Sequence, residues 1–184
     1  MSLLFLILID NSVSFRTTEI CFMSVFVTVG TTSFDELTEL VTSEPILKIL
    51  ETKSYSSLLV QYGRGHHQVK ECNTAGLKIN GYRYKDSISG DITNADLVIS
   101  HAGAGTCLEV LGARKPLVVV VNEKLMDNHQ FELAKQLHQD GHLLYCTCST
   151  LGSTLSEMDL QSLEPLPAPK TNKFGEDLTL HFQL

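Results

Sequence analysis

The stretch from Asp96 to Glu109 holds the residues whose types and spacing best suit the binding of a charged ligand. It begins with the apolar run 97–99, which is typical of a buried parallel strand. Gly103 and Gly105 follow, and because glycine has no Cβ, the backbone can turn sharply there and approach a ligand closely. We expect Thr106 to open a helix, which would aim backbone N–H groups and the positive end of the helix dipole at this turn. The pattern predicts a phosphate-binding site.

The same residues allow a purely structural interpretation. Thr106 and Glu109 have the spacing of a capping box, in which Glu109 would only close the first turn of the helix. A single Gly-x-Gly pair is a weak signal, so the spacing alone leaves both interpretations open. Ser33 and Glu36 form a second candidate capping box.

A dinucleotide site is an alternative that the sequence supports less well. Glu123 lies about 20 residues beyond the glycine pair, where an acid that binds the ribose of NAD is expected. However, the third glycine of that motif is replaced by Leu108, and the motif falls late in the chain.

A zinc site is also weakly supported. His138 and His142 are followed closely by Cys146 and Cys148, but we expect Gly141 to end the helix between the histidines. Cys146 falls in an apolar strand, where a thiol packs as a small hydrophobic group. The pair His66-His67 lies in a polar loop and is expected to be solvated.

The stretch Asp127-Asn128-His129-Gln130 places polar side chains at the start of another predicted helix. Asp127 and Gln130 could simply cap that helix. The amide and imidazole groups could equally hold sugar hydroxyls or phosphate, and the residue types do not separate these two roles.

The elements that must position these residues alternate between strand and helix. Because each expected strand is a solid apolar run, the pattern predicts an open parallel α/β sheet with helices on both faces. Ligands of such sheets bind at the carboxyl ends of the strands, where Gly30, Tyr82–Tyr84, Gly103 and the 122–127 loop would converge. The expected strands are 24–29, 58–62, 77–79, 97–99, 117–121 and 143–146, and the expected helices lie within 37–49, 87–93, from 106 onward and over 128–139, with 63–76 as loop.

Composition narrows the classes of protein. The 184 residues suffice for one domain with a real core. The formal net charge of −7 and a pI of about 5.4 argue against nucleic acid as the main partner. The five cysteines have no regular spacing, which favours reduced thiols in a cytosolic protein.

We predict three regions along the chain. Residues 1–22 are an N-terminal extension, interpreted as an alternative start before Met23 or, in a rival interpretation, as an interfacial anchor or added edge strand. Residues 23–163 form the ligand-binding domain. Residues 164–184 form a proline-containing linker and a short tail, weakly helical over 174–184.

Several motifs occur together in one order along the chain. The combination closely resembles the soluble catalytic subunits of the eukaryotic UDP-N-acetylglucosamine transferase of asparagine-linked glycosylation, from Met23 to about Leu163. The motifs are Val27–Asp35 (VTVGTTSFD), Tyr82–Asp86 (YRYKD), Ala95–Thr106 (ADLVISHAGAGT), Asn122–Gln130 (NEKLMDNHQ) and Gly141–Leu143 (GHL).

The resemblance implies a single Rossmann-like domain, equivalent to the C-terminal, donor-binding half of a GT-B glycosyltransferase such as the bacterial enzyme that makes lipid II. It implies that Gly103 to Thr106 cradle a diphosphate, that Glu109 takes the ribose hydroxyls and that backbone around Arg83-Tyr84 holds the uracil. The full donor-binding set that it implies is Gly30, Thr31, Thr32, Arg83, Tyr84, His101, Gly103, Ala104, Gly105, Thr106, Glu109, Asn122, His129 and Gln130.

The resemblance also implies a reaction and a partner. Such enzymes transfer GlcNAc from UDP-GlcNAc to GlcNAc-diphospho-dolichol with inversion, without a metal or other cofactor. The acceptor-binding half, with the general base, would be a membrane-anchored subunit at the cytosolic face of the endoplasmic reticulum, to which this cytoplasmic chain is recruited. The alternative is a catalytically impaired isoform that acts as a UDP-sugar-binding or partner-binding module.

Overall fold

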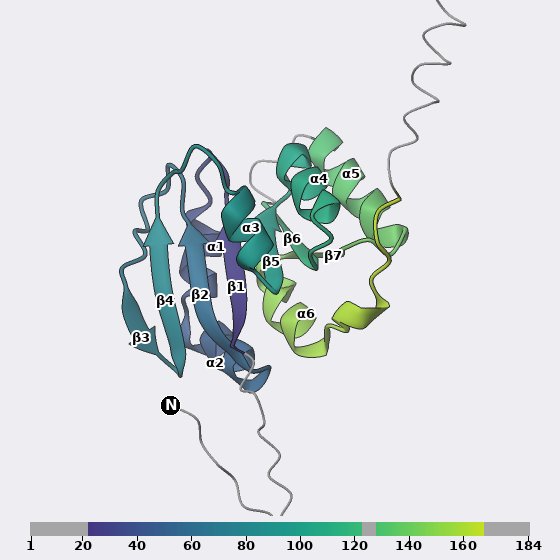
Figure 1. Cartoon of the computed structure of the whole chain (residues 1–184). Coiled ribbons are helices and arrows are strands. Elements are labelled where there is room, and N and C mark those ends of the chain that lie inside the picture. The colour runs from purple at the N-terminus through teal and green to yellow at the C-terminus, as the bar shows by residue number, and fades with distance from the viewer. Residues whose placement is uncertain (1–21, 123–127, 168–184) are drawn as a thin grey trace, which may run out of the picture.

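The computed structural model describes residues 22–122 and 128–167, and the side chains of 22–122 and 132–167. One seven-stranded sheet runs through this part of the chain in the order β3-β4-β2-β1-β5-β6-β7 (Figure 1). All neighbouring strands are parallel except β3 and β4, which are antiparallel. The strands are β1 (Met23–Thr28), β2 (Tyr55–Gln61), β3 (Cys72–Thr74), β4 (Leu77–Tyr82), β5 (Leu97–His101), β6 (Leu117–Val121) and β7 (Leu144–Thr147).

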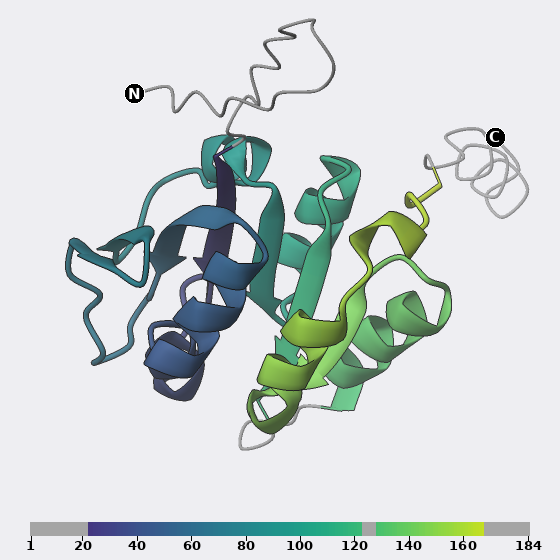
Figure 2. The same cartoon turned by 90° about the horizontal axis from the view of Figure 1, so that it is seen from below.

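Helices cover both faces of the sheet, as Figures 1 and 2 show from two directions. On one face, α1, α2 and α6 bury a core that includes Leu37, Leu47 and Leu151. On the other face, α3, α4 and α5 bury a second core that includes Ile92 and Val110. The helices are α1 (Asp35–Val41), α2 (Glu44–Thr52), α3 (Ser89–Asn94), α4 (Ala104–Gly112), α5 (Asn128–Gln139) and α6 (Leu151–Glu157), with short 3₁₀ turns at Cys148–Thr150 and Leu160–Ser162.

The predicted open parallel sheet with helices on both faces is confirmed. The central strands are apolar throughout because both of their faces are covered, and every residue of β6 is buried. The prediction that 63–76 is only loop was wrong, because β3 pairs there with β4. β4 also extends beyond the predicted end at Ile79, so that Tyr82 belongs to the strand and Arg83 follows it directly.

Two predicted helix starts were also wrong. α4 begins at Ala104 with Gly103 at its N-cap, two residues before Thr106, so Thr106 and Glu109 do not form a capping box. α1 begins at Asp35 with Phe34 at its N-cap, so Ser33 does not cap it. Phe34 is buried in the core, which shows that tertiary packing outweighed the local capping preference.

The parallel strands follow the doubly wound order of Rossmann-like folds, with β1 and β5 side by side at the centre. The chain winds outward in opposite directions on the two sides of this pair. In open α/β sheets such a topological switch point leaves a crevice outside the carboxyl ends of the strands. Gly30 follows β1 and Gly103 follows β5, so both predicted glycine turns lie at the crevice, at the upper edge of the sheet in Figure 1.

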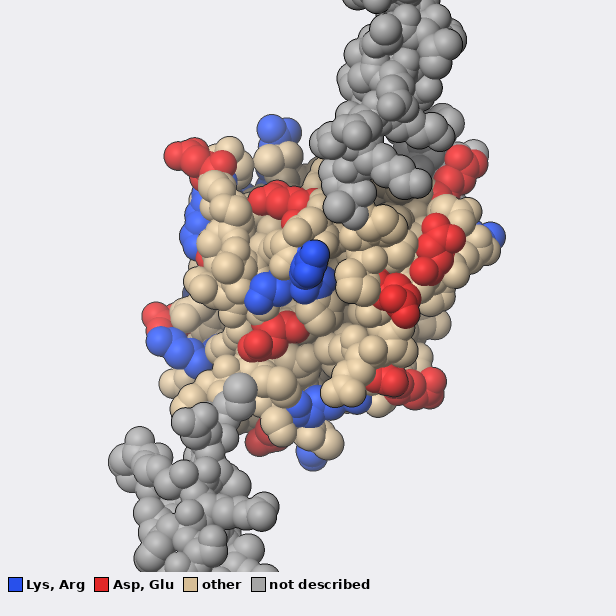
Figure 3. Space-filling model, turned by 45° about the vertical axis from the view of Figure 1, so that its right-hand side comes forward, with Lys and Arg blue, Asp and Glu red and all other residues tan. Residues whose placement is uncertain are grey.

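The surface carries charges of both signs. On the face that Figure 3 shows, basic and acidic side chains are interspersed among wide uncharged areas. No helix within residues 22–122 and 128–167 combines the length and apolar character needed to cross a membrane. The predicted alternative start at 1–22 and the helical tail at 174–184 lie outside the described residues, apart from Phe22.

The core around β1 gives a direct test of this architecture. Phe26 is 1% exposed and packs between the sheet and the α3–α5 layer, whereas Phe22, four residues earlier, is 75% exposed. We expect Phe26→Ala to lower the free energy of unfolding by about 3–5 kcal/mol, because it removes a buried ring and leaves a cavity. Chemical denaturation with the matched control Phe22→Ala, which should change stability by less than about 0.5 kcal/mol, checks this. Equal losses in the two variants would contradict the placement of β1.

Candidate ligand site at the carboxyl ends of the strands

The imidazole of His101 lies between the glycine turns that follow β1 and β5. A Cβ added at Gly30 would approach His101 Cε1 to 3.0 Å, and one added at Gly103 would approach His101 Nε2 to 2.5 Å. Gly30 also has a backbone φ of +62°, which residues with a Cβ rarely adopt. Both turns therefore need glycine for a physical reason that the sequence did not reveal, namely the histidine ring between them.

His101 is held in an unusual electrostatic state. Its Nδ1 atom is buried and has no hydrogen-bond partner among the described residues. Burial lowers the pKa of the imidazole. The backbone of Thr28 opposes this shift only in part, and it forms no hydrogen bond of normal geometry with Nδ1. His101 is therefore neutral at physiological pH, with a buried polar atom that a small shift of the ring can satisfy.

The N-terminus of α4 opens onto the same place. Its first helical hydrogen bond runs from Cys107 N to Gly103 O at 3.0 Å, so the N–H groups of the preceding first turn have no partner within the helix. Gly103 has no side chain with which to cap them, and Ala104 and Gly105 are exposed. Exposed N–H groups at the positive end of a helix dipole are suited to an anion.

Glu109 lies further along α4, on its exposed side. It does not cap the helix, so the capping-box interpretation of this carboxylate is removed. A carboxylate in this position is free to accept hydrogen bonds from ligand hydroxyl groups.

A row of buried polar side chains supports the two glycine turns from below. Thr28, Gln61 and Ser100 occupy matching positions near the ends of neighbouring strands and are at most 2% exposed. Thr28 Oγ1 donates to Gln61 Oε1 and accepts from Gly30 N at 3.0 Å, while Ser100 Oγ donates to His101 O at 2.9 Å. Sequence reasoning missed this row, although polar residues at the ends of otherwise apolar strands are a signal that could have found it.

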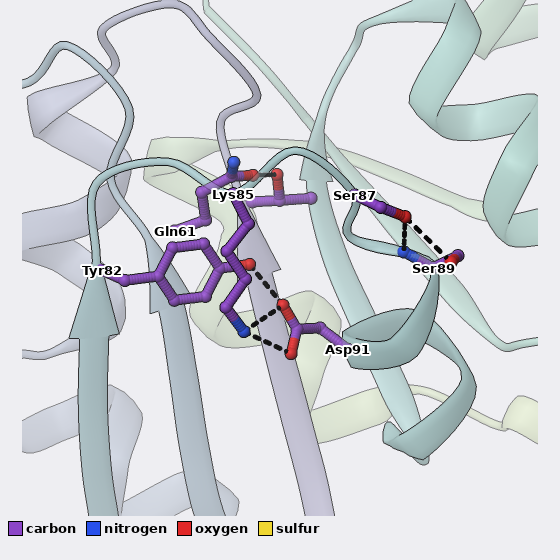
Figure 4. Close-up of polar contacts among 7 residues, drawn as sticks. Gln61, Tyr82, Lys85, Ser87, Ser89 and Asp91 are labelled. Carbon is purple, nitrogen blue, oxygen red and sulfur yellow. Dashed lines mark hydrogen bonds and ion pairs between the residues drawn. The ribbon is translucent and has the colours of Figure 1, made fainter.

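The turn after β4 is fixed by a second polar cluster, which Figure 4 shows. The Tyr82 hydroxyl donates to Asp91 of α3, and Lys85 Nζ lies 2.8 Å from both Asp91 carboxylate oxygens. Lys85 Nζ also lies 4.1 Å from the centre of the Tyr82 ring. Burial, followed by the hydrogen bond to Asp91, raises the pKa of Tyr82, which therefore remains a donor. This cluster anchors the Arg83–Tyr84 turn and was not predicted.

Of the predicted site residues, three line a pocket of about 360 Å³ between the turns after β1, β2 and β4. These are Thr31, Arg83 and Tyr84, and they are joined by Gly63 and Arg64, which the sequence analysis did not single out.

The remaining predictions fall at other places. Thr32 and Asn122 lie at the same sheet edge, and Asn122 is half-buried directly after β6. The side chains of His129 and Gln130 fall outside the described part of the chain, as do Glu123 and Asp127.

Three of the four residues of the alternative zinc site are used otherwise. His138 Nδ1 pairs with Leu143 O at 3.0 Å, and His142 Nδ1 pairs with Glu164 O at 2.9 Å. Cys146 is buried, which raises its thiol pKa to about 12 and disfavours the thiolate that binds metal. Among the described residues, no three histidine, cysteine or acidic side chains gather as a metal site would require.

Comparison with known proteins gives a consistent result. The model of the glycosyltransferase family 28 C-terminal domain matches residues 24–181. The UDP-N-acetylglucosamine transferase subunit ALG13 of Mus musculus is 61% identical over 126 residues, or 68% of this chain. That alignment covers only 11% of the mouse protein, so the chain spans about a tenth of this relative's length. ALG13 of Eremothecium gossypii is 32% identical over 182 residues, which cover 83% of this chain and 90% of that protein.

Solved structures share the fold. The NMR structure of ALG13 has a TM-score of 0.64 at 27% identity and covers 85% of this chain and 95% of its own. The crystal structure of Acinetobacter baumannii MurG has a TM-score of 0.56 at 21% identity, and the match covers 84% of this chain but 50% of MurG. At that identity MurG shows the fold alone, which is the Rossmann-like half of a GT-B glycosyltransferase. From its matched residues, its relatives and its fold, the chain belongs to the glycosyltransferase family 28 C-terminal domain family.

Proposed function

We propose that the chain binds UDP-GlcNAc and transfers GlcNAc to GlcNAc-diphospho-dolichol, as the catalytic subunit of a heteromeric enzyme. The observation that carries the proposal is the convergence of the open N-terminus of α4 and the His101 imidazole at the switch point of the sheet. Relatives named as UDP-N-acetylglucosamine transferase subunits support the choice of donor.

In this proposal the first turn of α4, from Gly103 to Thr106, binds the diphosphate through backbone N–H groups. His101 Nε2, the ring nitrogen that faces Gly103, offers one further hydrogen bond to the phosphate oxygens. Glu109 accepts hydrogen bonds from the ribose hydroxyls, and the backbone at Arg83 and Tyr84 holds the uracil. Gly30, Thr31, Thr32 and Asn122 complete the edge of the site, and His129 and Gln130 hold the donor sugar.

The proposed reaction inverts the anomeric carbon of the donor sugar. The O4 hydroxyl of the acceptor forms the new bond to that carbon as the bond to the diphosphate oxygen breaks, and its electron pair passes to the departing UDP. Fixed N–H groups at the start of α4 stabilise this charge without reorganisation, so we propose that no metal is needed. A general base must take the proton from O4.

We propose that this base comes from a second, membrane-anchored subunit. GT-B sites lie between two Rossmann-like domains, and this chain corresponds in fold to half of MurG. The word "subunit" in the names of its relatives supports an assembly of chains. We therefore place the working enzyme at the cytosolic face of the endoplasmic reticulum, where the partner carries the acceptor.

The decisive test is GlcNAc transfer from UDP-GlcNAc to GlcNAc-diphospho-dolichol, measured with the full chain alone and with the membrane subunit added. We expect activity only when both are present. If the partner is active with an authentic catalytic subunit but not with this chain, the chain is a UDP-sugar-binding or partner-binding module and the proposed catalysis is wrong.

Gly103→Ala should weaken the binding of UDP at least tenfold. The added Cβ would lie 2.5 Å from His101 Nε2, so the ring must move out of the space between the two glycine turns and into the diphosphate site. Isothermal titration calorimetry with UDP measures this, and Gly112→Ala at the far end of the same helix is the matched control because nothing lies within 4 Å of its Cβ. Unchanged UDP affinity in Gly103→Ala would remove the diphosphate assignment.

Glu109→Ala should weaken UDP-GlcNAc binding by about tenfold, which corresponds to one lost charge-assisted hydrogen bond, while the melting temperature stays nearly constant. The side chain is exposed and caps nothing, so the fold does not depend on it. Glu39→Ala, an exposed glutamate on α1, is the control. A variant that melts early yet binds the donor normally would show that Glu109 is structural.

A further inference from the structure

The segment that follows β4 presents backbone groups that the rest of the described structure does not use. Residues 83–87 are all exposed and belong to no helix or strand. Among the described residues, the N–H groups of Arg83, Tyr84 and Lys85 and the carbonyl groups of Tyr84 and Lys85 have no hydrogen-bond partner. A short run of available donors and acceptors can match the edge of a nucleobase, provided that it is held in one conformation.

Backbone hydrogen bonds fix only the beginning of this segment. Tyr62 N donates to Tyr82 O at 3.0 Å, and Gly63 N donates to Arg83 O at 3.1 Å, which continues the pairing of β2 with β4. The Arg83 side chain returns to the same neighbour, because its Nη1 donates to Gly63 O at 3.2 Å. Within the described parts of the chain, the backbone after Arg83 makes no further backbone–backbone hydrogen bond before the first turn of α3.

The rest of the segment is tied to α3 through Asp91, as Figure 4 shows. Lys85 Nζ lies 2.8 Å from both carboxylate oxygens of Asp91 and 4.1 Å from the centre of the Tyr82 ring. The Tyr82 hydroxyl donates to the same carboxylate. In residues 22–122 and 128–167, no other hydrogen bond or ion pair joins residues 84–86 to the rest of the protein. Asp91 therefore connects the end of β4, the exposed segment and α3.

The Asp91 carboxylate is shielded from water, which distinguishes its ion pair from an ordinary surface pair. The Asp91 side chain is 15% exposed, whereas the side chains of the Glu71–Lys78 pair at the other end of β4 are 69% and 59% exposed. An exposed pair adds little rigidity, but a shielded and hydrogen-bonded network holds its members in place. Ile92, next to Asp91, is buried in the core, so α3 is itself firmly placed.

Uracil and cytosine differ in the hydrogen-bonding pattern that such a segment would meet. Uracil presents an N3–H donor beside the O4 acceptor, whereas cytosine presents an N3 acceptor beside the N4 amino donor. Backbone groups that are held in one place satisfy only one of these patterns, and the mismatched base leaves polar groups unpaired. A segment that could reorient its N–H and C=O groups would accept either base.

We propose that Asp91 is a positioning residue that makes the donor site selective for uracil, because it holds the backbone of residues 83–85 in the conformation that accepts this base. The inference rests on the proposed function, in which this backbone holds the uracil. Asp91 acts through Lys85 and Tyr82, which occupy its carboxylate, and does not contact the nucleotide. No hydrogen bond or ion pair among the described residues joins this cluster to α4, so the proposed diphosphate site does not depend on it.

Isothermal titration calorimetry of the full chain with UDP and with CDP tests the inference. The two ligands share the ribose and the diphosphate, so an effect transmitted through α4 or through general stability changes both affinities alike. We expect the unaltered chain to prefer UDP by about tenfold or more. Asp91→Ala should reduce this preference to about twofold, mainly by weakening UDP, because the segment is no longer fixed before the base arrives. Glu71→Gln, which breaks the exposed ion pair at the other end of β4, is the matched control and should keep the preference.

Lys85→Met is a second variant that leaves Asp91 and its contact with Tyr82 in place. It removes the charge that pairs with Asp91 and keeps an unbranched side chain over the Tyr82 ring. We expect the same loss of selectivity, and the double variant should lose no more than either single variant, because both residues act through one contact. An unchanged ratio of UDP to CDP affinity in either single variant, or an equal weakening of both ligands, would overturn the inference.

The outcomes also separate this inference from the proposed function. Failure of the unaltered chain to bind UDP would remove the proposed function, and the inference with it. UDP binding that is no tighter than CDP binding in the unaltered chain would remove the inference alone. The same holds for a strong preference for UDP that survives both Asp91→Ala and Lys85→Met.

Discussion

The candidate site depends on the close approach of two backbone turns across a single imidazole ring. β1 and β5 are neighbours, so the turns after them must pass within van der Waals distance of His101, and only glycine fits at positions 30 and 103. The buried hydroxyls of Thr28 and Ser100 hold these turns from below. The open end of α4 is aimed at the crevice because this arrangement fixes where the helix begins. A neutral, desolvated histidine at the centre keeps the crevice from carrying a permanent positive charge of its own.

Much of this organisation could be predicted from the sequence, and the failures share a cause. Apolar strand runs and glycine turns identified the sheet, the faces covered by helices and the turn at Gly103, because these features follow from local periodicity. The starts of α1 and α4 were misplaced because burial of Phe34 and the approach of Gly103 to His101 are tertiary effects that outweigh capping preferences. β3 was missed because its three residues are all exposed and have no apolar pattern. Arg64 was missed because nothing local indicates that Arg83 will lie across the sheet edge from it.

The two sides of the Gly30–Thr32 turn differ in the positive charge that they present. Backbone N–H groups at the start of α4 present partial positive charge, whereas Arg64 and Arg83 in the neighbouring pocket carry full charges on their side chains. The first kind of site is set by the fold and is difficult to tune. The second can change its selectivity through one substitution while the sheet stays intact.

The outer edges of the sheet have a consequence for how the chain behaves before it meets any partner. β3 has three residues and β7 has four. An exposed ion pair joins Glu71, directly before β3, to Lys78 of β4. Edges this short offer few unpaired backbone groups for the addition of a strand from another molecule, and the ion pair at the β3 edge adds charge there. The sheet therefore resists the self-association that threatens open β-sheets at high concentration.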